Sequence, residues 1–207
     1  MQLLCPADPS VSRRVWIGSG ESEVGPRIGG RAPGGVQLAQ EFDAATYLMT
    51  LPLSVQPELE ASVFLSFDFE GMADNSGLLR PNGLVTVVAH GQSRRADTQG
   101  HVSLLSEHPL VLGDSAEDEF VSDNGVRVIR SSHKIGGRPF FLHGEPQLEA
   151  DVEAAYRSGF RQLVQLAFPG GSNDATVSGD WPFGDGLFHV FVREDGEQFE
   201  FLRFWEF

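Results

Sequence analysis

The sequence predicts a mainly β fold with a few short helices, an α+β protein arranged as one compact unit. Glycine occurs 24 times and proline 12 times in 207 residues, which limits the length of regular elements. Between them stand short apolar runs rich in β-branched and aromatic residues, a composition typical of strands. Hydrophobic residues make up 41% of the chain, so we expect a folded core.

Strand patterns are strongest in five segments, and in the last of them the aromatic residues Phe199, Phe201 and Trp205 share one face. Asp195-Gly196 precedes that segment and predicts a hairpin turn. The predicted strands are residues 63–69, 84–88, 126–129, 187–192 and 199–207.

Helical patterns are fewer. Residues 147–158 carry Leu148, Val152 and Ala155 at helical spacing, and Gly159 follows as a stop signal. Residues 36–49 are a second candidate helix.

An internal repeat divides the chain. Residues 27–31, Arg-Ile-Gly-Gly-Arg, reappear at 134–138 as Lys-Ile-Gly-Gly-Arg. Two strand-like matches follow in the same order: 64–69 with 163–168, and 83–88 with 186–191. We therefore expect a single domain, 1–207, built by duplication from repeats of about 1–100 and 101–207. Such halves usually pack about a pseudo-twofold axis.

The second repeat resembles the YwqG-like family of bacterial domains. Three segments carry the resemblance: SHKIGGRPFF at 132–141, QLVQL at 162–166 and FGDGLFHVF at 183–191. It covers about residues 130–207, and the first half matches only through the repeat. The resemblance implies two intertwined β-rich repeats and supplies no catalytic residues. Members of the family are often encoded near bacterial toxin and immunity genes.

Charge and composition limit the classes of partner. Acidic residues outnumber Lys and Arg by 29 to 15, a formal net charge of −14, whereas nucleic-acid binding needs clustered cations. No run of 18 apolar residues is present, so we expect no membrane span. The single cysteine, Cys5, suits a reducing cytoplasm.

Motifs for catalysis, cofactors and metals are missing from the sequence. It contains neither G-x-S-x-G nor a P-loop, and its six histidines have no zinc spacing. Carboxylate pairs such as Asp180 and Asp185 arise by chance among 29 acids. We expect a protein that is not an enzyme, with no cofactor and no metal. The double glycines are interpreted as structural turns, with an anion-binding nest as the alternative.

Acidic clusters are the main candidate binding features. Residues 107–123 hold six acids and no Lys or Arg, and residues 145–153 add a second set. An aromatic residue within the first run would form an apolar contact, and a tryptophan in a loop would stack on a sugar or a partner. The candidate partner-binding residues are Asp114, Glu117, Asp118, Glu119, Phe120, Asp123, Glu149, Asp151 and Trp181.

The sequence therefore predicts a cytoplasmic, non-enzymatic immunity protein. It would bind a cognate basic toxin and occlude the active site of that toxin, because complementary charge speeds association and disfavours wrong partners. The alternative is a small-molecule or glycan-binding module built on the double-glycine turns and Trp181.

Overall fold

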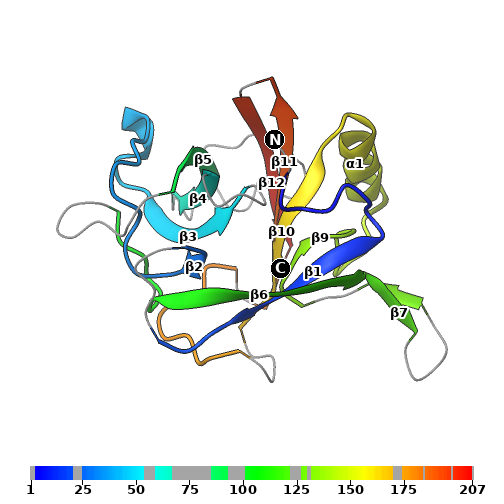
Figure 1. The fold of residues 1–207 in the computed structure, drawn as a ribbon, viewed down its shortest axis with the longest axis horizontal. Coiled ribbons are helices and arrows are strands. Elements are labelled where there is room, and N and C mark those ends of the chain that lie inside the picture. Colours follow the sequence, from blue (N-terminus) through cyan, green and yellow to red (C-terminus); the bar gives the residue numbers. More distant parts are fainter. Residues whose placement is uncertain are drawn as a thin grey trace.

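One large antiparallel sheet dominates the fold (Figure 1). Beside it lie a two-stranded sheet and one α-helix within the described part of the chain. The mainly β prediction is therefore confirmed. The computed structural model describes residues 3–20, 25–53, 59–66, 85–92, 101–121, 127–129, 132–169, 174–183, 185–196 and 198–206.

Most of the described elements are short strands. In chain order they are β1 (Val11–Ile17), β2 (Arg27–Ile28), a 3₁₀ turn (Gln40–Phe42), β3 (Thr46–Pro52), β4 (Leu59–Leu65), β5 (Val85–Gly91), β6 (His108–Glu117), β7 (Glu119–Val121), β8 (Arg127–Ile129), β9 (Lys134–Gly136), α1 (Pro146–Arg157), β10 (Arg161–Leu166), β11 (Leu187–Asp195) and β12 (Gln198–Glu206).

The large sheet has β1 and β6 at its centre. Its strand order is β12-β11-β10-β9-β1-β6-β2-β3-β4-β5. The central strand β1 pairs with β9, and β6 pairs with β2, so each central strand also pairs with a strand from the other half of the chain. The edge strands β5 and β12 contact each other, and the sheet therefore curls into a near-barrel around the main apolar core.

This strand order contradicts part of the predicted repeat. The two double-glycine segments do occupy matching places, at β2 and β9. The other two matches are wrong. Residues 64–65 lie in β4, next to an edge strand, whereas residues 163–166 lie in β10, next to β9. Residues 85–88 lie in the edge strand β5, whereas residues 187–191 lie in β11 between two neighbours. By position in the sheet, β3 matches β10, β4 matches β11 and β5 matches β12. Apolar strands resemble one another wherever they lie, so composition did not identify their places.

The predicted strands and hairpin overlap the structure. Residues 63–65, 85–88, 127–129, 187–192 and 199–206 all lie in strands. Residues 67–69, 84, 126 and 207 lie outside the described part. The turn between β11 and β12 is confirmed by the pairing of Asp195 with Gln198 and by Gly196, which has a φ of 63°.

Helix α1 confirms the prediction for residues 147–158. Pro146 stands at the start of the helix, and Gly159, with a φ of 87°, follows its end. The side chains of Leu148, Val152 and Ala155 are buried on one face. They pack in a second apolar cluster with aromatic residues of β11 and β12, so the helix covers that part of the sheet.

The second predicted helix, residues 36–49, is wrong. Only a 3₁₀ turn forms there, and β3 begins at Thr46. Strand β3 lies between β2 and β4, and five consecutive residues, 47–51, are buried. A strand buried on both faces loses the alternation of apolar and polar residues that identifies strands in a sequence.

The double-glycine segments form turns, and the amides of the first pair are used within the fold, which favours the structural interpretation. Gly29, Gly30, Gly136 and Gly137 have φ values of 73°, 74°, 75° and 77°, a region that favours glycine. The amides of Gly29 and Gly30 donate to the carbonyls of Leu48 and Leu105, so neither is available to an anion.

A row of buried polar side chains crosses each half of the sheet. Across β2, β3 and β4, Arg27 lies opposite Thr50, and Thr50 lies opposite Ser62. In the other half, across β9, β10 and β11, Lys134 lies opposite Gln165, and Gln165 lies opposite His189. All six side chains are buried, and the bulges in β3–β4 and β10–β11 lie at matching positions beside these rows.

Candidate functional site

The predicted acidic run is a strand. Residues 108–117 form β6, whose first two residues pair with β2, whereas the residues from Leu110 to Glu117 pair with β1. Figure 1 shows β6 continuing into β7 at the margin of the molecule, away from β3, β4 and β5. We call residues 114–121 the acidic arm. Asp114, Glu117 and Glu119 are exposed on it.

Asp118 lies at the base of the acidic arm, and its assignment as a partner-binding residue is corrected. Its side chain is only 1% exposed, and Lys134 Nζ donates to both carboxylate oxygens at 2.9 and 2.8 Å. The amide of Arg138 donates to the same carboxylate at 2.9 Å. The Asp118 amide donates to the carbonyl of Ser10. This residue therefore fixes the arm to the sheet, through a cation that is distant in sequence.

Two other predicted residues of this run are only partly placed. Phe120 lies in β7, where its backbone pairs with Val128 of β8. Asp123 lies outside the described residues.

The acids of α1 form a separate group. Glu149 is exposed, and Asp151 is half-buried, accepting a hydrogen bond from Gln147 at 3.0 Å. The helix and the acidic arm are supported by the same turn, because Tyr156 donates its hydroxyl proton to the carbonyl of Gly137 at 2.7 Å.

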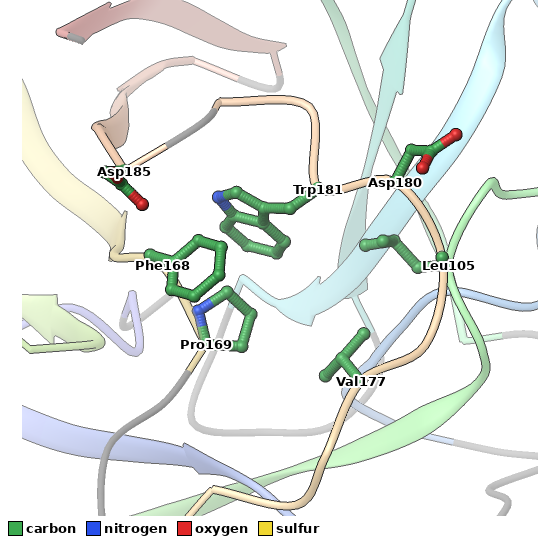
Figure 2. Close-up of a pocket in the computed structure, with 8 residues that line it drawn as sticks. Leu105, Phe168, Pro169, Val177, Asp180, Trp181 and Asp185 are labelled. Atoms are coloured by element: carbon green, nitrogen blue, oxygen red, sulfur yellow. The ribbon is translucent and has the colours of Figure 1, made fainter.

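Trp181 lines a pocket of about 360 Å³ (Figure 2). The described residues that line it are Leu105, Phe168, Pro169, Val177, Gly179, Asp180, Trp181 and Asp185. Sequence analysis identified the tryptophan but missed Phe168, Leu105 and Val177, since they come from three separate segments. The neighbouring Asp180 and Asp185 were noted in the sequence, and the fold places both at this pocket.

The pocket segment 174–181 is held by hydrogen bonds to the sheet. The Ile17 amide donates to Asp174 Oδ1 at 2.9 Å, and the Ala175 amide donates to the Ile17 carbonyl at 2.7 Å. Further along, the Ser178 amide donates to Ser106 Oγ at 2.9 Å, and the Ser106 amide donates to the Ser178 carbonyl at 2.8 Å. The segment is therefore fixed to the end of β1 and to the residues before β6.

The aromatic residues of this loop have different environments. Phe183 is 3% exposed and stacks on Phe188, with ring centroids 4.5 Å apart. Trp181 is half-buried and contacts Phe183 in an edge-to-face arrangement at 5.8 Å. Its indole Nε1 has no hydrogen-bond partner among the described residues. Phe183 thus fills the core, whereas Trp181 supplies a wall of the pocket.

Two histidine pairs have the contacts that acid–base chemistry uses. Ser62 Oγ lies 2.8 Å from His90 Nε2; the Ser62 side chain is fully buried, and His90 is half-buried. His133 Nε2 lies 3.3 Å from Asp174 Oδ2, and these side chains are 3% and 7% exposed. The hydroxyl of Ser62 and the His133–Asp174 pair are therefore enclosed by the fold, which disfavours their contact with a substrate.

Other site chemistry is sparse in the described residues. Burial raises the pKa of the Cys5 thiol to about 11, which disfavours its nucleophilic thiolate form. No cluster of three or more potential metal-binding His, Cys, Asp or Glu residues occurs in the described ranges. Within the same ranges, no helix is long and apolar enough to cross a membrane.

Comparison with known proteins finds no matching family model, no similar curated protein and no similar solved structure. The resemblance to the YwqG-like family therefore stays a prediction.

Proposed function

We propose that this chain is a non-enzymatic immunity protein of the bacterial cytoplasm, a binder that neutralises a cognate basic toxin. The observation that carries the proposal is the acidic arm. It exposes Asp114, Glu117 and Glu119, while Asp118 is buried in an ion pair with Lys134 at its base. Exposed charge on a firmly held strand is suited to a partner of opposite charge.

Electrostatics explains how such an arm would act. Toxins that cut or modify nucleic acids need basic grooves, because their substrates are polyanions. A strand with several carboxylates imitates a polyanion and competes for the groove. At a net charge of −14 the whole protein also attracts a cationic partner over about 10 Å at 0.1 M salt.

We also propose that the chain arose by duplication within the YwqG-like family. Matching double-glycine turns, bulges and buried polar rows support this history. The alignment that supports this history matches β2, β3, β4 and β5 with β9, β10, β11 and β12. It replaces the strand matches that were predicted from composition.

Charge reversal on the acidic arm tests the immunity function. The test variant carries Asp114→Lys, Glu117→Lys and Glu119→Lys. The matched control carries three reversals of exposed acids elsewhere, Asp43→Lys, Glu194→Lys and Asp195→Lys. The partner is the product of the adjacent gene, and association rates are measured at low and high salt. We expect the arm variant to associate at least severalfold more slowly than the control at low salt, with a smaller difference at high salt.

Two results would contradict this proposal at different levels. Equal rates for the two variants at both salt concentrations would remove the arm from the interface. Absence of a complex between the unmutated protein and the adjacent gene product would count against the immunity function.

The second candidate function is a small-molecule or glycan-binding module. The pocket beside Trp181 favours it, because sugar rings stack on tryptophan and hydrogen-bond to carboxylates such as Asp180 and Asp185. A screen of neutral glycans and metabolites against the full chain tests this candidate.

A further inference from the structure

The pocket beside Trp181 combines aromatic and acidic groups. Its eight described lining residues include the rings of Phe168 and Trp181 and the carboxylates of Asp180 and Asp185, but no Lys, Arg or His. Within the described part of the chain, neither carboxylate makes an ion pair. A pocket with this lining is complementary to a cation.

The arrangement of these groups favours a flat cation. Phe168 and Trp181 both line the pocket, and in the view of Figure 2 Asp185 lies on the side of the nitrogen-bearing edge of the indole and Asp180 on the opposite side. A guanidinium group stacks on an aromatic face and also donates two parallel hydrogen bonds to one carboxylate. An ammonium is a compact, strongly hydrated charge and gains less from the aromatic walls.

We propose that this pocket binds an arginine side chain presented by a protein partner. The apolar surroundings favour a chain over a free small molecule. Phe168 lines the pocket, and its large apolar side chain is 51% exposed. Apolar residues that flank an arginine in a protein would cover this ring, which a free guanidinium compound would leave in water.

The pocket is preorganised for such a ligand. Its segment is hydrogen-bonded to Ile17 and Ser106, as described above. Gly179 has a φ of 112°, and a Cβ at this position would lie 2.0 Å from the carbonyl oxygen of Leu104. The backbone of Gly179 therefore approaches that of Leu104 and Leu105 as closely as only glycine permits, and an isolated β-bridge joins Gly179 to Leu105, which fixes the wall before a ligand arrives.

This inference deepens the proposed function, because it rests on a cationic protein partner and assigns that partner a second contact. The first contact is electrostatic and is made along the acidic arm. The second is a short-range contact in the pocket, where an aromatic wall and a carboxylate select an arginine in particular. The two contacts use different residues and are separable by mutation.

A peptide titration of the full chain tests the pocket without the toxin. The probe is acetyl-Gly-Leu-Arg-Leu-Gly-amide, and the matched probe carries citrulline, which is nearly isosteric and uncharged, in place of arginine. Binding is followed by NMR chemical-shift changes of the tryptophan indoles. We expect the arginine peptide to bind at least tenfold more tightly than the citrulline peptide, and more weakly as salt increases.

Two variants locate the binding. Asp185→Asn preserves the size of the side chain and removes its charge, and we expect it to weaken arginine-peptide binding at least fivefold. Asp195→Asn is the matched control, because Asp195 is exposed at the end of β11, next to the hairpin turn, and asparagine suits that position. The control is expected to bind like the unmutated protein.

Three outcomes would overturn the inference. These are equal binding of the two peptides, an Asp185→Asn variant that binds as well as the Asp195→Asn control, and binding of methyl glucoside in preference to the arginine peptide. The last outcome would favour the glycan-binding candidate. If the adjacent gene product binds through the acidic arm while the arginine peptide does not bind, only the pocket assignment fails and the immunity proposal stands.

Discussion

The two halves of the large sheet differ in which of their buried polar side chains are well paired. In the half built from β2 to β5, the uncharged groups are satisfied: Tyr47, Thr50, Ser62 and His90 form a chain of hydrogen bonds of 2.7, 2.8 and 2.8 Å. The cation of this row is less well satisfied. Arg27 donates one hydrogen bond to a backbone carbonyl, but its Nε and Nη2 have no hydrogen-bond partner in the described residues.

The half built from β9 to β12 has the reverse arrangement. Here the cation is well paired, since Lys134 contacts both carboxylate oxygens of Asp118. The uncharged end of the row is not well paired. Neither ring nitrogen of His189 has a hydrogen-bond partner among the residues that the structure describes, and the imidazole stacks on Phe204 at 4.3 Å. Burial, together with the charge of Lys134, lowers the pKa of His189 to about 3.

Position in the sheet therefore determines which residues are polar and buried, while nearby segments determine which hydrogen-bond and charge partners those residues have. Asp118 comes from the acidic arm, and its carboxylate also accepts a hydrogen bond from the amide of Arg138, which follows the double-glycine turn. The ion pair with Lys134 therefore links the exposed surface of the proposed interface to the interior of the sheet.

The largest effect is expected from removing one cation in each row. Lys134→Met leaves the Asp118 carboxylate buried without its cation, which should lower the free energy of unfolding by about 3–5 kcal/mol. Arg27→Met should cost less, because Arg27 has fewer hydrogen bonds to lose. Urea unfolding measures both. Adding Asp118→Asn to Lys134→Met should restore part of the loss, and equal losses for the two Met variants would contradict the contrast between the rows.

The second effect is a pH dependence caused by His189. Its pKa is lower in the folded state than the usual value near 6.5, so the unfolded state binds the extra proton as pH falls between these two values. This histidine should therefore cost the folded state about 2 kcal/mol between pH 7 and pH 5. His189→Leu should remove that loss. Unfolding free energies at the two pH values check it, and a variant with unchanged acid sensitivity would contradict the assignment.

The smallest loss of stability is expected from breaking the chain of hydrogen bonds that joins Tyr47, Thr50, Ser62 and His90. Ser62→Ala removes the link between Thr50 and His90 and leaves buried polar groups without partners, so we expect a loss of about 1–2 kcal/mol in unfolding free energy. Thr50→Ser keeps a hydroxyl at the neighbouring position and serves as the control, with a smaller loss. A Ser62→Ala protein as stable as the unmutated chain at pH 7 would show that the chain of hydrogen bonds contributes nothing.

Local patterns predicted much of the fold. Helix α1 was predictable because Leu148, Val152 and Ala155 repeat at helical spacing, and β11 and β12 because a turn sequence separates two apolar runs. Strand β3 was not, since burial on both faces removes its alternation. The acidic strand β6 was missed because charged residues are unusual in strands, and its exposed end tolerates them only at the margin of the sheet.

The candidate sites, like the strands and the helix, were predictable only where they depended on local sequence. The sequence identified acids at 114–119 and an aromatic residue at 181 as unusual features. It did not separate Asp118 from Glu117 and Glu119, because the distinction depends on Lys134, which lies beyond the arm in sequence.

The mainly β class, helix α1 and the glycine turns were predictable because each depends on residues close together in the chain, and the excess of negative charge follows from composition. The order of the strands, the burial of Asp118, and the meeting of Leu105, Phe168 and Trp181 in one pocket emerged only from the folded structure. Burial and pairing depend on contacts between distant segments. Such contacts form only when the sheet is assembled, and short-range periodicity does not encode them.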